Sequence, residues 1–295
     1  MLAITRLNHF FIVLYFLEII YYAREWDYFT IEPLILSNKE VYVLTGIFDH
    51  ETMIGIENPF ENWSDEEIDK ELDVMYENWT NEELLIIKED ETLCDKQLLE
   101  YFRICLTTGF VIEVQISKNS ALEKNIFYFS EKKVIQNVIT DDNGEKQCTF
   151  KECGTPEVAW QFIYQALQPK NTFSRPNYTF KIPSSAYKET ILNQSNKQLV
   201  DYLKLYLDDQ ASLELANIIH NREELNTVQV HYYIKDSWST DCIQFLYSQN
   251  QYWLIQKVLD NKQTQTNFIC LDTFTITEEI KKMVLYLKSL GGKTR

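Results

Sequence analysis

The residues best suited to acid–base or metal chemistry are histidines, cysteines and clustered carboxylates. None of the four histidines has a partner at metal-ligand spacing: His9, His50, His220 and His231. His231 alternates onto the polar face of its segment beside Gln229 and Tyr233, and His50 falls in an expected helix C-terminal turn, where the helix dipole favours histidine. We therefore expect no histidine to be catalytic.

The cysteines and carboxylates also match no known site. The six cysteines form no CxxC pair, and Cys148 with Cys153 lacks the further ligands of a zinc site, so we expect buried free thiols in a reducing compartment. Four carboxylates suggest a divalent cation, but they fit no EF-hand loop and point in different directions on a helix: Glu66, Glu67, Asp69 and Glu71. The prediction is no metal and no cofactor.

Enzyme motifs are also missing. With 7 glycines in 295 residues the chain has no phosphate-binding loop, no dinucleotide fingerprint and no GxSxG elbow. We predict that it is not an enzyme, with an unrecognised carboxylate site as the open alternative. The net charge of −16 argues against binding to DNA, RNA or anionic lipid and suits a basic or apolar protein partner.

The acidic charge is concentrated in residues 57–95, which hold 15 acidic residues and two lysines and so a net charge of −13. A short sequence motif occurs twice in this segment, as Glu61-Asn-Trp-Ser-Asp-Glu-Glu67 and as Glu77-Asn-Trp-Thr-Asn-Glu-Glu83. Ser64 and Thr80 are each expected to cap a helix, as is Ser37 earlier in the chain with Glu40 three residues later. Trp63 and Trp79, just before the caps, either belong to an acidic surface that grips a basic partner or pack locally.

The elements that would position any site follow a repeated order. Short β-branched and aromatic runs at 110–116, 125–130 and 133–139 predict a β-meander, with a turn at 141–144 and a helix from Thr155 to Leu167. Runs at 228–234, 242–248, 252–258 and 267–274 predict a second meander, followed by a helix from Thr277 to Leu290.

Short matches in the same order support a duplication. Lys96-Gln-Leu-Leu-Glu-Tyr-Phe102 aligns with Lys197-Gln-Leu-Val-Asp-Tyr-Leu203 just before each meander, apart from an insertion at 208–224. We predict an α+β fold of two similar halves, with antiparallel sheets flanked by helices in a pseudo-twofold duplication. The halves are residues 29–170, including the acidic helical segment 57–95, and residues 171–295.

Residues 1–28 form an apolar N-terminal extension or helix. Phe10-Phe-Ile-Val-Leu-Tyr-Phe-Leu17 is followed by Glu18, so the apolar run is too short and too interrupted for a membrane span. No clean cleavage site follows at Ala23. We expect a packed helix in a cytoplasmic protein, with an N-terminally anchored or secreted protein as the alternative.

The order of elements resembles the EspG family of proteins associated with ESX (type VII) secretion, in its divergent low-GC Gram-positive form. The likeness is carried by Ser37-Asn-Lys-Glu-Val-Tyr-Val-Leu44 leading to Met53-Ile-Gly-Ile56, by Phe127-Tyr-Phe-Ser130 to Ile135, and by Tyr252-Trp-Leu-Ile255 running to the helix after Thr277. The resemblance implies a non-catalytic cytosolic chaperone, with a central antiparallel sheet, that holds a helical secretion substrate through an exposed apolar tip.

Such a protein needs exposed apolar groups surrounded by charge. The inter-strand loop at 117–125 carries Leu122 at its expected tip, and the matching loop at 236–241 carries Trp238. We predict that Leu122 and Trp238 contact the protein partner, with Trp63 and Trp79 as the next candidates. The alternative function is an acidic, immunity-type inhibitor of a basic toxin, for which the acidic segment is the best argument.

Overall fold

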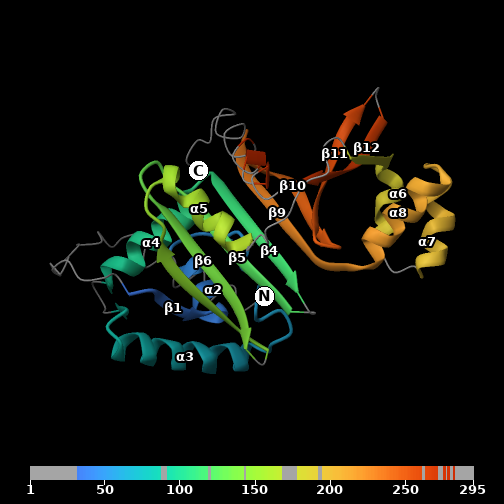
Figure 1. The fold of residues 1–295 in the computed structure, drawn as a ribbon. Coiled ribbons are helices and arrows are strands. Elements are labelled where there is room, and N and C mark those ends of the chain that lie inside the picture. The colour runs from blue at the N-terminus through green and yellow to red at the C-terminus, as the bar shows by residue number, and fades with distance from the viewer. Residues whose placement is uncertain are drawn as a thin grey trace. The chain divides into compact units, whose positions relative to one another are not determined.

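The computed structural model describes residues 32–87, 92–118, 121–142, 144–167, 178–191, 195–260 and 263–271, with 275, 276, 278, 279 and 282. The expected N-terminal helix and most of the helix predicted from Thr277 to Leu290 lie outside these residues. The chain divides into two compact units (Figure 1). The first contains residues 1–108 and 128–155, and the second contains residues 109–127 and 156–295.

The first unit is an antiparallel sheet packed with helices. Its strand order is β1-β7-β6-β5, of which β5 contributes only its last residues, and its elements are β1 (Leu34–Ser37), α2 (Asn38–Ile47), α3 (Asp65–Asn81), β2 (Leu85–Ile87), β3 (Thr92–Cys94), α4 (Lys96–Thr107), β5 (Ala121–Phe129), β6 (Val134–Asp142) and β7 (Glu145–Glu152). Helix α2 packs on β1 and β7, and α4 packs on β6. Apolar side chains on these elements form the core, with Phe102 in ring contact with Phe48 and Phe150.

Local capping explains where the helices of this unit begin. Ser37 accepts a hydrogen bond from the N–H of Glu40, and the Glu40 carboxylate accepts one from the N–H of Ser37 at 2.7 Å. Ser64 and Glu67 make the same reciprocal pair at the start of α3. Both capping boxes confirm the sequence prediction.

The predicted second helix start at Thr80 is wrong. Helix α3 runs without a break from Asp65 to Asn81, so Thr80 lies in its last turn. The helix stops because Glu83 takes a left-handed conformation (φ 56°), which lets the N–H of Leu84 bond to the Trp79 carbonyl at 2.9 Å. This is a Schellman ending in which glutamate occupies the usual glycine position.

The second unit contains a larger antiparallel sheet. Its strand order is β5-β4-β9-β10-β11-β12-β8, with elements β4 (Phe110–Lys118), α5 (Pro156–Leu167), β8 (Thr179–Pro183), α6 (Ser184–Ile191), α7 (Asn196–Leu203), α8 (Asp209–His220), β9 (Arg222–Ile234), β10 (Ser237–Ser248), β11 (Gln251–Asp260) and β12 (Gln263–Leu271). Helix α5 packs on β4, α6 packs on β8 and β12, and α8 packs on α7 and β10. The completely buried Trp253 ring contacts Tyr178 and Phe180 at the centre of the core.

The protein is therefore an α+β protein with a large antiparallel sheet flanked by helices, as predicted. Each half of the sequence opens with a short strand that runs into a helix and pairs antiparallel with the last strand of its own meander, β1 with β7 and β8 with β12. The predicted insertion at 208–224 corresponds to α8. Strand β7 was not predicted. By contacts, β4, most of β5 and α5 group with the second unit rather than with the rest of the first half.

Candidate partner-binding site

Trp79 is an internal residue of the first unit. It is 0 % exposed, its ring meets Tyr76 edge-on at 5.5 Å, and its Nε1 donates to Glu40 Oε1 at 2.9 Å. Because the other Glu40 oxygen accepts the N–H of Ser37, one carboxylate joins the start of α2 to the end of α3. In the folded protein Trp79 is not available to a partner.

Trp63 is half-buried at the edge of a hollow of about 500 Å³ in the first unit. Lys39 Nζ lies 4.6 Å from the centre of its ring, and the Phe60 ring meets it edge-on at 5.4 Å. Lys39 also pairs with Glu71 at 2.7 Å. The indole is already engaged with its own chain, so only part of its surface is open to a partner. The structure does not bring Trp63 and Trp79 together on one surface.

The outer side of α3 is acidic. Its exposed residues include Asp65, Glu66, Asp73 and Glu77, with Val74 54 % exposed among them. Within the described part of the chain no three histidine, cysteine or carboxylate side chains are placed to hold a metal ion. The acidic side chains are spread along the helix, so this face suits attraction of a basic protein surface rather than coordination of a single ion.

Leu122 does not lie at a loop tip. Strand β4 continues to Lys118 and β5 begins at Ala121, so the expected loop at 117–125 is mostly strand. Leu122 belongs to β5, and its side chain is outside the described part of the structure. The prediction was wrong about the loop because Ala121-Leu-Glu-Lys-Asn125 has no strong strand propensity and is held in place by pairing.

Trp238 also lies in a strand, next to a hairpin turn. Lys235 and Asp236 both have positive φ, at 50° and 59°, and close a two-residue turn after which β10 begins at Ser237. Trp238 faces Tyr233 across the ladder, with ring centres 5.5 Å apart, and is half-buried. The expected loop at 236–241 is therefore strand except at Asp236, but Trp238 still lies near the end of an extended hairpin.

A polar cluster on β4, β9 and β10 was not predicted. The Glu113 carboxylate lies 3.6 Å from His231 Nε2 and 3.8 Å from Lys124 Nζ, and Gln115 donates to it at 2.5 Å. His231 Nδ1 lies 3.0 Å from Thr240 Oγ1. Only strand pairing brings these residues together, so no spacing in the sequence could reveal them.

The environment of Glu113 keeps it ionised. Burial raises the pKa of the Glu113 carboxyl, but the neighbouring His231 ring, the hydrogen bond from Gln115 and the charge of Lys124 outweigh it, so the pKa lies below its ordinary value. Neither Glu113 nor His231 lines a cavity found among the described residues. The pair therefore has the surroundings of a buried polar contact in a sheet rather than of an acid–base site open to a substrate.

Exposed apolar side chains gather in the turn between α7 and α8 and on the outer side of α8. Leu205 is 70 % exposed, Leu213 is 52 % exposed, and Tyr206 is exposed with its ring against Tyr202. These are unusual because, in the described part of the chain, the other large apolar residues are mostly buried. The sequence does not reveal them, because a Leu-rich helical stretch has the pattern of a core segment until its neighbours are known.

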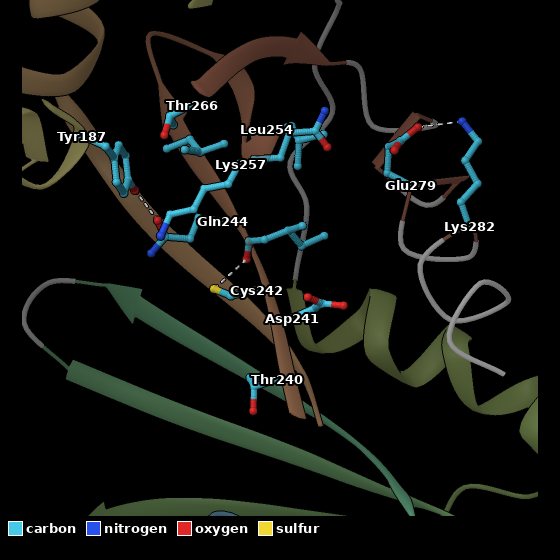
Figure 2. Close-up of a pocket in the computed structure, with 13 residues that line it drawn as sticks. Tyr187, Thr240, Asp241, Cys242, Gln244, Leu254, Lys257, Thr266, Glu279 and Lys282 are labelled. Carbon is cyan, nitrogen blue, oxygen red and sulfur yellow. Dashed lines mark hydrogen bonds and ion pairs between the residues drawn. The ribbon is translucent and has the colours of Figure 1, made fainter. Parts of the chain in front are cut away.

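The second unit also contains an open cavity of about 810 Å³ where two strands separate (Figure 2). It is lined by β10 from Thr240 to Gln244 and by β11 from Leu254 to Lys257. Tyr187 on α6 closes one side and is hydrogen-bonded to Gln244.

No helix in the described residues is long and apolar enough to cross a membrane.

Comparisons with known proteins give the fold a precedent. No family model matches the chain, and no curated protein matches its sequence. Among solved structures, the chain is similar to the Mycobacterium tuberculosis type VII secretion system chaperone EspG5, described in complex with the PE25–PPE41 dimer. The match has a TM-score of 0.55 and 6 % identity, and covers 84 % of this chain and 94 % of that one. The chain therefore shares the fold of a type VII secretion system chaperone.

Proposed function

We propose that this protein is a non-catalytic, cytosolic, chaperone-like protein that binds a helical type VII secretion substrate. The observation that carries the proposal is the fold shared with EspG5 across 84 % of this chain, since that protein is described in complex with a secreted dimer. The absence of recognisable enzyme motifs from the sequence agrees with it.

The exposed Leu205 and the half-buried Trp238 of the second unit are the best candidates to cover an apolar end of the substrate. Trp238 at the end of the β9–β10 hairpin and Leu205 after α7 are on elements packed into a large core. Each buried apolar side chain of this size is worth roughly 1.5–3 kcal/mol, and tryptophan is enriched among residues that dominate interfaces. The net charge of −16 keeps the free protein soluble despite these groups.

The test is co-purification with small helical secretion substrates encoded beside the gene. Trp238→Asp, Leu122→Asp and Leu205→Asp would be compared singly, with the Trp238/Leu122 pair also changed together. Val74→Asp is the matched control, because Val74 is 54 % exposed on α3 in the other unit.

We expect Trp238→Asp or Leu205→Asp to reduce co-purification at least tenfold, about 1.4 kcal/mol or more, without a change in thermal stability. Val74→Asp should bind normally. Full binding by all the second-unit variants would reject these surfaces and turn attention to the half-buried Trp63. Failure of every neighbouring helical substrate to bind the unchanged protein would reject the function itself.

An acidic immunity-type inhibitor is the second candidate, favoured by the exposed acidic side of α3. A basic toxin would then be encoded alongside, and its binding would weaken steeply with salt. Asp73→Lys together with Glu77→Lys should abolish toxin binding, whereas Trp238→Asp should not. The opposite pattern would support the chaperone.

A further inference from the structure

The sheet of the second unit forks between β10 and β11. Strand β10 pairs with β9 along its whole length, but it pairs with β11 only from Gln244 to Ser248. Beyond that point β11 continues beside β12 alone, as far as Asp260. In the described part of the chain, no strand pairs with the β11-facing edge of β10 between Ser237 and Ile243. The 810 Å³ cavity is the opening of this fork (Figure 2).

The backbone groups that open into the fork can be assigned from the ladder. In a two-residue hairpin the residues flanking the turn exchange both backbone hydrogen bonds, and every second pair does the same. In β9–β10 the flanking pair is Ile234 and Ser237. The N–H and C=O groups of Trp238, Thr240 and Cys242 therefore point away from β9, into the fork.

The facing edge belongs to β11. Ile255 pairs with Gln244, and by alternation the backbone of Lys257 faces the same side. An extended polypeptide placed in the fork would thus meet, on both sides, backbone donors and acceptors that no described strand pairs. A helix has already used its own backbone groups and could not satisfy them.

One side chain in the fork, Lys257, favours a carboxylate beside it in the occupant. Lys257 extends along the cavity, and no ion pair is found for it within the described residues (Figure 2). Lys282 at the rim is neutralised by Glu279 at 2.7 Å. Among the described residues that line the cavity, Lys257 is therefore the cation without an ion pair, and Asp241 is the remaining anion.

We propose that this fork binds an extended, acidic segment of a partner polypeptide, which adds to the free edge of β10 as an extra strand with a carboxylate near Lys257. The free edge, Ser237 to Ile243, spans roughly 23 Å at the usual rise per residue. This activity is separate from the proposed binding of a helical substrate, since it uses backbone groups rather than exposed apolar side chains.

The experiment is a selection of random heptapeptides displayed on phage against the full-length protein, followed by affinity measurement with the enriched peptides as synthetic probes. Cys242→Pro is the blocking variant. Its exposed side chain makes only a 3.9 Å sulfur contact to Ile243, and its N–H faces the fork, so proline removes an edge donor without breaking the β9 ladder. Ile243→Pro is the matched control that should destabilise the fold, because the N–H of Ile243 pairs with β9.

We expect acidic, proline-free peptides to be enriched and to bind Cys242→Pro and Lys257→Glu about tenfold or more weakly than the unchanged protein. Bound peptide should slow amide exchange at Trp238, Thr240 and Cys242. Trp238→Asp, which keeps the backbone, should retain peptide binding even where it loses the helical substrate, so the two proposals fail separately.

Three results would overturn the proposal. The first is that selection on the unchanged protein enriches no peptide beyond those enriched by selection on Cys242→Pro. The second is enriched peptides that bind that variant equally well. The third is dimerisation that Cys242→Pro abolishes without any peptide binding, because the edge would then serve a second copy of the chain. Self-association gained on Lys257→Glu, with no peptide selected, would likewise show that Lys257 only protects an exposed edge.

Discussion

Replacing Trp79 separates a structural role from a binding role at the most distinctive residue of the acidic segment. Trp79→Phe keeps most of the buried aromatic surface but removes the indole N–H that donates to Glu40 at 2.9 Å. A hydrogen bond to a charged group contributes about 1.5–3 kcal/mol. We therefore expect Trp79→Phe to lower the free energy of unfolding by about 2 kcal/mol. Trp79→Ala should lower it by about 3–5 kcal/mol, because the 0 % exposed ring leaves a cavity.

The assay is urea unfolding followed by far-ultraviolet circular dichroism, which does not depend on tryptophan fluorescence. A double-mutant cycle with Glu40→Ala isolates the side-chain pair, and Ser37→Ala measures the capping box of α2 on its own. We expect a coupling free energy of about 1.5–2 kcal/mol between Trp79 and Glu40, and about 1 kcal/mol for the cap.

A coupling below about 0.5 kcal/mol would refute the account of this contact. So would a Trp79→Phe variant of unchanged stability that no longer binds a partner, since it would place Trp79 at an interface. Partner binding should survive Trp79→Phe at temperatures where the protein stays folded.

Three further predictions concern charge, thiols and turns. Glu113→Gln should cost on the order of 1 kcal/mol at pH 7, and the cost should vanish as the pH falls below about 4.5, because a depressed carboxylate pKa stabilises the fold only where the group is ionised. Iodoacetamide should modify the exposed Cys242 before the buried Cys148, whose pKa burial raises to about 11, as peptide mass spectrometry can show. Asp236→Gly should raise stability by up to about 1 kcal/mol in urea titrations, because glycine adopts positive φ without strain.

Each of these has a clear contrary result. A stability difference for Glu113→Gln that persists unchanged to pH 3 would mean that the carboxylate is not held ionised by its neighbours. Equal labelling rates for Cys148 and Cys242 would contradict the burial of Cys148. Loss of stability in Asp236→Gly would show that the aspartate side chain supports the turn in a way that outweighs its backbone strain.

Local chemistry in the sequence predicted the starts of α2, α3 and α5 and most of the strands. The Ser37–Glu40 and Ser64–Glu67 capping boxes were recognisable because each involves residues three apart in the chain. Thr80 has the same local pattern, yet it lies inside a helix that had already begun at Asp65. Local patterns mark where a helix can start, but not whether an earlier helix has already covered the same residues.

The candidate sites were much less accessible to sequence analysis. Trp238 was identified as a residue near an inter-strand connection, but its pairing with Tyr233 depends on a turn without glycine. The Glu113–His231–Thr240 cluster joins three strands and depends on their register. The fork depends on where the pairing of β10 with β11 stops, which alternating apolar residues do not encode.

The pairing of each half's first strand with its last has a consequence for how the chain folds. Leu34 of β1 pairs with Phe150 of β7, and Thr179 of β8 pairs with Ile269 of β12. Neither opening strand has a partner until the ribosome has delivered the whole meander that follows it. Contacts between residues so distant along the chain slow folding. Until they form, the unpaired β1 and β8 strands can pair with non-native strands or aggregate. Each half of this protein is therefore expected to complete its sheet only after the last strand of its meander, β7 or β12, has been synthesised.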